Sequence, residues 1–255
     1  MRKFTPYEIN HLIEFGFNSF VLSNILDLHI PVEYVTGKIK FCNNIFSVNN
    51  KVLIPRIETE QLVDLAYDFI IKTYKKKDKI VFADIGTGSG CIGISLAKKL
   101  MDNNYSFEAI LSDFSSEALE VCKINLDNYL AKELLLKNNS KIELLKSDLL
   151  KSFPRNIRFN LIMANLPYIP SLRLLTLDLS VTKYEPKIAL DGGKDGLKVI
   201  SRFLKEINPF INKGSKLIIE VDDDHNNINR FLSTWKIDKI KDIFEKNRFW
   251  SITPL

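Results

Sequence analysis

The sequence has few of the residues that build cross-linked or metal-stabilised folds, with three cysteines and three histidines among 255 residues. Cys42, Cys91 and Cys122 lie far apart, with neither paired spacing nor neighbouring histidines, which argues against a disulfide framework and a zinc site. His225 follows three aspartates, a composition reminiscent of metal sites, but an exposed loop is the favoured interpretation. We therefore expect no metal, and a reducing cytoplasmic environment.

Long apolar runs are also missing. No stretch of about 18 uninterrupted apolar residues occurs, and the first residues, Met1–Pro6, meet polar side chains and a proline at once. We expect neither a membrane span nor a signal peptide. The excess of 36 basic over 31 acidic residues is compatible with an RNA-rich neighbourhood but too small to indicate nucleic-acid binding. A content of 45% hydrophobic and 26% charged residues is typical of a folded protein.

Three patterns precede the main part of the chain. Between Tyr7 and Leu28, apolar residues recur at steps of three and four, which predicts one or two amphipathic helices with a break at Gly16. From Phe41 to Leu53, short apolar stretches lie between asparagines, a pattern typical of a hairpin. A helix is then expected to run from Pro55–Glu60 through Ile71.

After the charged linker Lys75–Lys79, short apolar stretches alternate with helical ones, which predicts βαβ units and a mainly parallel sheet. The last two strands are close enough in sequence to pair as an antiparallel hairpin. We expect an α/β fold with a seven-stranded, Rossmann-like sheet in residues 51–255, preceded by a small helical domain with a hairpin connection in residues 1–50. The expected strands are Ile80–Ile85, Glu108–Asp113, Lys141–Lys146, Phe159–Ala164, Ser215–Val221, a strand near Ile237–Phe244, and Arg248–Thr253.

A glycine-rich turn, Asp84–Cys91, follows the first strand and opens a helix over Ile92–Leu100. Glycines permit a tight turn and let a ligand lie against backbone N–H groups at the carboxyl edge of the sheet. Cys91 occupies the place where a dinucleotide-binding motif needs its third glycine, and no Lys-Ser or Lys-Thr follows, which disfavours both NAD and a P-loop. A ligand with a cationic centre and no pyrophosphate remains. The residues expected to bind it are Gly86, Thr87, Gly88, Ser89 and Gly90.

Acidic residues end the next two strands. Asp113 is placed so that its carboxylate could accept both ribose hydroxyls of an adenosine, and Asp148 and Leu149 are placed to flank the adenine. The alternative interpretation is that Asp84, Asp113 and Asp148 merely punctuate strand ends.

The segment Asn165–Tyr168 directly follows the fourth strand, at the same edge as the glycine turn. An amide nitrogen is a poor nucleophile because its lone pair is delocalised, so a site that methylates it must orient it with acceptors. Asn165 Oδ1 and the Leu166 backbone carbonyl can each accept one N–H of a substrate NH₂, Pro167 stiffens the turn, and Tyr168 offers a flat face. Proximity and orientation could then supply roughly 7 to 11 kcal/mol. Alone, the segment is more often an ordinary turn; beside the glycine turn, it favours a catalytic pocket.

With both motifs in view, the sequence from about Tyr34 onward resembles the HemK/PrmC-type methyltransferases, which modify the glutamine of the Gly-Gly-Gln motif in peptide chain release factors. The resemblance implies that Gly86–Gly90 and Asp113 bind S-adenosylmethionine, with Leu149 near its adenine. It also implies that Asn165–Tyr168 hold the glutamine amide beside the methyl donor, so that Asn165 is expected to contact the cofactor as well as the substrate, and that the N-terminal helices dock the release factor. The glycine motif is shared by many methyltransferases, whereas the first and last matching segments are specific to this family. The matching segments are Val52–Glu60, Asp84–Cys91, Asn165–Tyr168 and Tyr184–Leu197.

The sequence departs from the family pattern in three places. Leu166 replaces a proline, but the role assigned to this residue uses its backbone carbonyl, so the expected consequence concerns the rigidity of the turn. Ile57 replaces a usual proline, which is expected to be a structural change. The helical N-terminal segment is shorter than usual, which bears on docking affinity or substrate range.

The long segment Ile169–Asp195 lacks clear periodicity, and we expect it to cap the substrate pocket. Glu185 and Asp191 either anchor this segment or are solvated charges. The charged residues of the Pro55–Glu60 segment, Arg56, Glu58 and Glu60, are expected to join the two domains rather than to contact the methyl group.

Two other functions compete with glutamine methylation. An exocyclic amino group of adenine in nucleic acid poses the same geometric problem and would be delivered by base flipping. The sequence has no obvious recognition domain or basic stripe, so sequence-specific nucleic-acid binding is not expected. The second alternative is a module that binds the cofactor without catalysis, in which the replacement of the family's proline by Leu166 would reflect a loss of catalytic activity. We expect a monomer.

Overall fold

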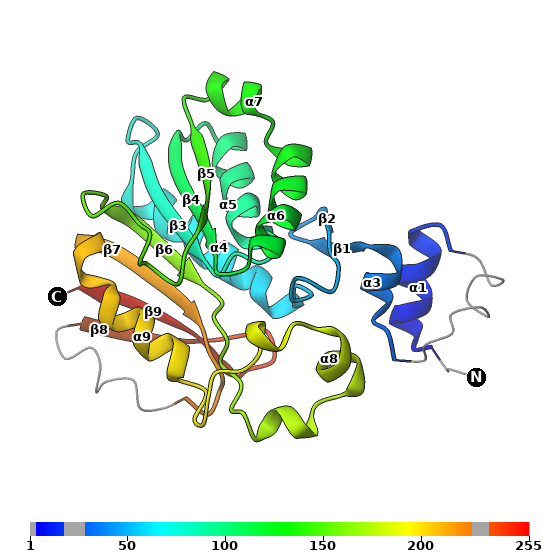
Figure 1. Ribbon diagram of the computed structural model, residues 1–255. Coiled ribbons are helices and arrows are strands. Elements are labelled where there is room, and N and C mark those ends of the chain that lie inside the picture. The colour runs from blue at the N-terminus through cyan, green and yellow to red at the C-terminus, as the bar shows by residue number, and fades with distance from the viewer. Residues whose placement is uncertain (1–3, 18–28, 226–234, 255) are drawn as a thin grey trace.

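The computed structural model describes residues 4–17, 29–225 and 235–254 of the chain. Its centre is a seven-stranded sheet with the order β5-β4-β3-β6-β7-β9-β8 (Figure 1), in which β9 runs antiparallel to both of its neighbours and the other neighbouring strands are parallel. This confirms the predicted α/β fold and the closing antiparallel hairpin. The strands are β3 (Ile80–Ile85), β4 (Phe107–Asp113), β5 (Lys141–Lys146), β6 (Phe159–Ala164), β7 (Ile211–Glu220), β8 (Trp235–Lys241) and β9 (Asn247–Pro254).

Helices cover both faces of the sheet, so its central strands are buried on both sides. Successive residues of β3 alternate between two apolar cores: Phe82 packs in the cluster formed with α4, α5 and α6, and Ala83 packs in the cluster formed with α9. This double burial explains why the strands appear in the sequence as nearly continuous apolar runs. The helices are α4 (Glu60–Thr73), α5 (Cys91–Asp102), α6 (Ser116–Tyr129), α7 (Lys132–Lys137) and α9 (Lys198–Glu206).

Two short helices, α1 (Pro6–Glu14) and α3 (Val32–Thr36), lie side by side and apart from the sheet (Figure 1). The Tyr7 hydroxyl donates to Glu33 at 2.8 Å, which joins the two helices. α1 ends before Gly16, whose φ of +87° agrees with the expected break. The rest of the predicted helical stretch, residues 18–28, lies outside the described residues.

The hairpin was predicted too far along the chain. Its strands are β1 (Lys38–Phe41) and β2 (Asn44–Ser47), joined by Cys42 and Asn43, which have φ values of +48° and +58°. Two left-handed residues make the tight turn that suits a twisted hairpin. Cysteine gives no sequence signal for that conformation, whereas the asparagines further along the chain are typical of turns, so the hairpin was predicted around them.

The hairpin is fastened to the main sheet domain through α6. The side chain of Asn125 accepts from Ser47 N–H at 2.7 Å and donates to the Ser47 carbonyl at 2.9 Å and to the Ser89 carbonyl at 2.8 Å. One buried amide therefore connects the hairpin to the glycine turn. The division into residues 1–50 and 51–255 remains a prediction.

The segment 169–195 contains short helical pieces: η2 (Arg173–Thr176), α8 (Leu179–Tyr184) and η3 (Lys187–Ala189). Glu185 holds it to the chain before α4, because its carboxylate accepts from Ile54 N–H at 3.2 Å and from Arg56 at 2.6 Å. Asp191 accepts from the Ser171 hydroxyl at 2.6 Å. The anchoring interpretation is confirmed for Glu185, whereas the hydrogen bonds of Asp191 to Ser171 and Gly193 lie within the segment itself.

The prediction that His225 lies in an exposed loop was wrong. His225 is 6% exposed, its Nδ1 accepts from Asp222 N–H at 3.3 Å, and its Nε2 lies 3.2 Å from the Asp195 carbonyl. Burial lowers the pKa of His225. The run of aspartates suggests an exposed loop, but Asp222 also binds Arg173 of the 169–195 segment, which holds the turn against the protein. Within the described ranges, no helix has the length and apolar character needed to cross a bilayer.

Candidate active site

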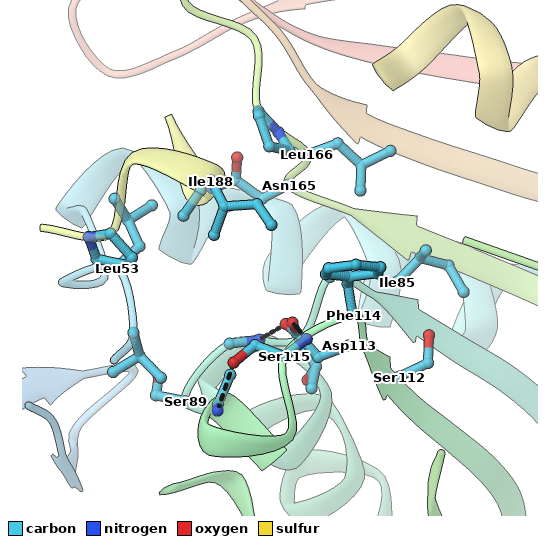
Figure 2. A pocket seen from close by; sticks show the side chains of 18 of the residues that line it. Leu53, Ile85, Ser89, Ser112, Asp113, Phe114, Ser115, Asn165, Leu166 and Ile188 are labelled. Carbon is cyan, nitrogen blue, oxygen red and sulfur yellow. Dashed lines mark hydrogen bonds between the residues drawn. The ribbon is translucent and has the colours of Figure 1, made fainter. Parts of the chain in front are cut away.

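A cavity of about 410 Å³ opens at the carboxyl ends of β3, β4, β5 and β6. Figure 2 shows Asp113, Phe114 and Ser115 on one side of it and Asn165, Leu166 and Ile188 across from them. The cavity brings together most of the predicted site residues, and two of them, Gly90 and Tyr168, are not among the described residues that line it. Those that line it are Gly86, Thr87, Gly88, Ser89, Asp113, Asp148, Leu149, Asn165, Leu166 and Pro167.

Further walls come from segments that carried no predicted ligand contact. Two stretches contribute to these walls, and Leu53 and Ile188 are drawn in Figure 2. Their lining residues are Lys51, Val52, Leu53 and Pro55 of the first and Pro186, Ile188 and Ala189 of the second. Pro186, Ile188 and Ala189 belong to 169–195, so this stretch borders the cavity; that it caps a bound substrate stays a prediction. Thr59 and Arg202 also line the cavity, and neither was predicted as a site residue.

The glycine turn is left-handed at three positions, with φ values of +72° at Gly86, +55° at Gly88 and +82° at Gly90. A Cβ atom at Gly86 would lie 3.1 Å from Cδ2 of Leu166, whereas a Cβ at Gly88 would meet no atom of the described residues within 4 Å. The glycine turn and the Asn165 segment are therefore packed against each other at Gly86, whereas the space at the Cβ position of Gly88 is open to a ligand. Leu166, the residue that replaces the family's proline, is buried in this contact.

Gly90 has a structural role, because it faces away from the cavity. A Cβ atom there would lie 2.6 Å from Cys122 Sγ and 2.7 Å from Ile94 Cδ1. We expect Gly90→Ala to lower the free energy of unfolding by about 2 to 4 kcal/mol, through the strained backbone and the overpacked core. Urea unfolding measures this change. The control is Gly214→Ala, where φ is +93° and a Cβ would meet nothing within 4 Å, so that about 1 kcal/mol of backbone strain is expected; equal losses in the two variants would refute the packing argument.

Asp84 stabilises the glycine turn through hydrogen bonds. It is fully buried, and its Oδ2 accepts from the Thr87 hydroxyl at 2.6 Å and from Gly93 N–H at 3.0 Å. Burial raises the pKa of Asp84 to about 6. Asp84 Oδ1 and the hydroxyl of Ser89 are buried and have no hydrogen-bond partner among the residues that the structure describes. Since buried polar groups are normally paired and Ser89 lines the cavity, the Ser89 hydroxyl fits a polar group of a bound ligand.

Asp113 fixes the opposite side of the turn. Its Oδ2 accepts from Gly88 N–H at 2.9 Å and its Oδ1 accepts from Ser115 N–H at 2.9 Å (Figure 2). Burial raises the pKa of Asp113. An ionised carboxylate has about four acceptor positions, so each oxygen keeps capacity for a ligand hydroxyl. Asp113 therefore does more than end a strand, and its geometry fits the predicted pair of ribose hydroxyls.

Asp148 and Leu149 line the cavity next to β5. The Asp148 carboxylate accepts from Lys151 at 2.5 Å, and both of its oxygens lie 2.8 Å from Nη2 of Arg202 in α9. These hydrogen bonds, with that of Lys151 foremost, lower the pKa of Asp148. Leu149 is buried in a left-handed conformation with φ of +54°. The contact of either residue with an adenine stays a prediction.

Asn165 reaches into a chain of hydrogen bonds behind the cavity. Its Nδ2 donates to the Thr59 hydroxyl at 3.4 Å, and that hydroxyl donates to Glu220 Oε2 at 2.7 Å. The Tyr168 hydroxyl donates to Glu220 Oε1 at 3.1 Å. Tyr168 is thus held from behind by the same carboxylate, and its predicted contact with a planar group stays a prediction.

Sequence reasoning missed both Thr59 and Glu220. Thr59 lies inside the Val52–Glu60 segment, in which roles were predicted only for the charged residues. Glu220 ends an apolar strand at the same edge of the sheet as the two motifs. An acidic residue at that point of the sheet is the signal that could have identified Glu220.

Comparison with known proteins places the chain among methyltransferases. The family model described as "Methyltransferase small domain" matches residues 55–175. The release factor glutamine methyltransferase of Leptospira interrogans is 38% identical over 75% of this chain and 62% of its own length. Those of Clostridium acetobutylicum and Bacillus cereus are 36% and 34% identical, over 80% and 84% of this chain and 67% and 70% of their own lengths. The chain thus spans about six- to seven-tenths of the relatives it matches.

Solved structures agree on the fold. The METTL16 MTase domain superposes with a TM-score of 0.54 over 82% of this chain and 72% of that domain, at 15% identity. The human methyltransferase 10 domain containing protein superposes with a TM-score of 0.52 over 82% of this chain and 87% of its own, also at 15% identity. At such identities, the likeness concerns the arrangement of helices and strands alone.

Proposed function

The chain belongs to the HemK/PrmC family of release factor glutamine methyltransferases, and on this premise we propose that it transfers a methyl group from S-adenosylmethionine to a glutamine side chain. The acceptor is the amide nitrogen of the glutamine in the Gly-Gly-Gln motif of peptide chain release factors. The reaction takes place in the cytoplasm, where release factors act, and the enzyme is a monomer.

The observation that carries this proposal is the meeting of two motifs in one cavity. On one side of the cavity, Gly88 leaves space beside its backbone and Asp113 supplies a carboxylate. Asn165 and Leu166 line the other side. Leu166 packs directly against the glycine turn at Gly86. A donor bound on the first side and an acceptor held on the second would therefore share one enclosed space, which is the requirement for direct transfer between them.

Each group has a defined task. When bound, S-adenosylmethionine supplies an electrophilic methyl group on its sulfonium. Asp113 would accept the ribose hydroxyls, and the backbone of Gly86–Ser89 would lie against the cofactor. Asn165 Oδ1 and the Leu166 carbonyl accept the two N–H groups of the substrate amide and so aim its nitrogen at the methyl group. Leu53 and Ile188 form an apolar wall that excludes water.

No strong general base is required in this scheme. The amide nitrogen becomes acidic once it carries the methyl group, so its proton can leave after the transfer. Catalysis then depends mainly on orientation, which can supply roughly 7 to 11 kcal/mol. The helices α1 and α3, which lie apart from the sheet (Figure 1), are the part that we propose to contact the release factor.

The proposal is tested by incubating the full chain with S-adenosylmethionine and a purified bacterial release factor, followed by mass spectrometry of the peptide that contains the motif. We expect that peptide to gain the mass of one methylene. A release factor in which the motif glutamine is replaced by alanine is the matched control and should gain nothing. Bound cofactor without transfer would contradict the proposal and favour either adenine amino groups in nucleic acid or a non-catalytic role.

A further inference from the structure

Glu220 is a buried carboxylate that serves two hydroxyl groups of the site. It ends β7, it is 1% exposed, and its two oxygens accept from Thr59 and Tyr168 separately, at 2.7 Å and 3.1 Å. A buried carboxylate needs such donors, because it has lost its water. Glu220 therefore holds the protons of both hydroxyls toward itself.

The hydroxyl of Thr59 has a single proton, and that proton is committed to Glu220. The Thr59 oxygen can then act only as an acceptor toward its other neighbour, the Asn165 amide, which lies 3.4 Å away through Nδ2. Thr59 is 2% exposed, so water does not compete freely for this position. The consequence is that Asn165 keeps its NH₂ group toward Thr59 and leaves Oδ1 for the substrate.

We infer that Glu220 is a positioning residue that acts through Thr59 to fix the orientation of the Asn165 amide, and that this orientation selects a primary amide over a carboxylate. The inference rests on the proposed function, since it assigns the substrate amide to Asn165. Glu220 and Thr59 lie 161 positions apart in the sequence and belong to neither of the two sequence motifs.

The selectivity follows from the kinds of atoms offered. With Oδ1 outward, Asn165 and the Leu166 carbonyl present two acceptors, which match the two N–H donors of an amide nitrogen. A glutamate at the same place would set its carboxylate against acceptors, leaving buried groups unpaired. An Asn165 that is free to turn over would present its NH₂ group instead, and it would tolerate the carboxylate.

The first test compares Thr59→Val, which keeps the shape and removes the hydroxyl, with Thr59→Ser, which keeps the hydroxyl. The substrate is the wild-type release factor, and the competitor is a release factor with glutamate in place of the motif glutamine. We expect Thr59→Val to lower kcat by about 10- to 100-fold through misorientation of the amide, with the Kd of the cofactor within about twofold of wild type. Thr59→Ser should stay within about threefold of wild type.

The competitor gives the readout that a merely structural role would not change. Inhibition by the glutamate-containing release factor should strengthen about tenfold in Thr59→Val relative to wild type and stay unchanged in Thr59→Ser. Thr73→Val, at the exposed end of α4, is the matched control and should resemble wild type in every respect. If Thr59→Val methylates and discriminates like wild type, the inference is wrong.

The pH profile of Glu220→Gln provides a second test. Burial raises the pKa of Glu220, and the groups around the carboxylate are Thr59, Tyr168, Arg248 and Glu58. As pH falls through this raised pKa, the protonated Glu220 no longer demands the Thr59 proton, so kcat should fall at a pH above the ordinary glutamate range. In Glu220→Gln this acid limb should vanish and kcat should be low throughout, by about 100-fold; an unchanged acid limb would contradict the inference.

An NMR measurement separates this inference from the proposed function. The side-chain NH₂ signals of Asn165 are identified by their loss in Asn165→Asp. Their hydrogen exchange should be about tenfold faster in Thr59→Val than in wild type and Thr59→Ser. If no release factor is methylated by wild type, the proposed function fails, yet this result still decides the relay from Glu220 to Asn165: equal exchange in all three proteins would sink it.

Discussion

Asn165→Ala should lower kcat for release factor methylation by about 10³-fold, the size of effect seen when a group that orients the reacting atoms is removed. The substitution removes the Oδ1 acceptor that aims the substrate amide and the NH₂ group that donates to the Thr59 hydroxyl. The Kd of S-adenosylmethionine should change by less than about threefold, because the cofactor keeps its expected contacts with Asp113 and the glycine turn. Single-turnover methylation and calorimetric cofactor titration give the two numbers.

Two further variants serve as comparisons for Asn165→Ala. Asn212→Ala makes the same change at an exposed position at the start of β7 and should leave kcat unchanged. Asn165→Asp keeps an oxygen but loses the NH₂ group that bonds to Thr59 and introduces a negative charge, so it should be nearly as inactive as the alanine variant. An Asn165→Ala protein that retains more than about a tenth of wild-type kcat would mean that orientation of the amide is achieved elsewhere.

Asp113→Ala should raise the Kd of S-adenosylmethionine by about 10² to 10³-fold, because hydrogen bonds to a charged group are worth about 1.5 to 3 kcal/mol each. The carboxylate is expected to accept both ribose hydroxyls, and it already fixes Gly88 N–H and Ser115 N–H at 2.9 Å each. Its loss therefore removes the ligand contact and loosens the turn. Calorimetry with the full chain, together with urea unfolding, separates binding from stability.

The controls for Asp113 use the same residue type. Asp127→Ala removes an exposed aspartate of α6 that pairs with Lys123, and cofactor affinity should not change. Asp113→Asn keeps the shape and one acceptor oxygen, so an intermediate Kd is expected. Cofactor affinity in Asp113→Ala that equals that of wild type would show that Asp113 holds the glycine turn without binding the cofactor.

The sheet could be predicted from sequence because its strands are buried on both faces. Ile80–Ile85 and Phe159–Ala164 appear as apolar runs bounded by charged or polar residues, and the structure has them with the same bounds. The hairpin could not be placed correctly, because its turn depends on the left-handed conformation of Cys42, for which side-chain chemistry gives no warning. His225 was misplaced for a similar reason, since burial of the turn after β7 depends on contacts with distant segments.

The two motifs of the site were visible in the sequence because each is a local turn after a strand, and parallel strands bring such turns to one edge. The groups that hold these turns are not local. Glu220 reaches Thr59 across 161 positions, and Arg202 reaches Asp148 across 54. No pattern within one segment indicates such a pair, so most of the predicted residues do line the cavity, whereas the residues that hold them in place could not be predicted.

The most direct test of this account is a crystal structure of the chain with S-adenosylhomocysteine and a release factor bearing the Gly-Gly-Gln motif. We expect the glutamine amide nitrogen within hydrogen-bond distance of Asn165 Oδ1 and the Leu166 carbonyl, with the ribose hydroxyls on Asp113 and the Asn165 NH₂ group on Thr59. A glutamine side chain outside the cavity between Asp113 and Asn165, or one bound through donors instead of acceptors, would contradict the account.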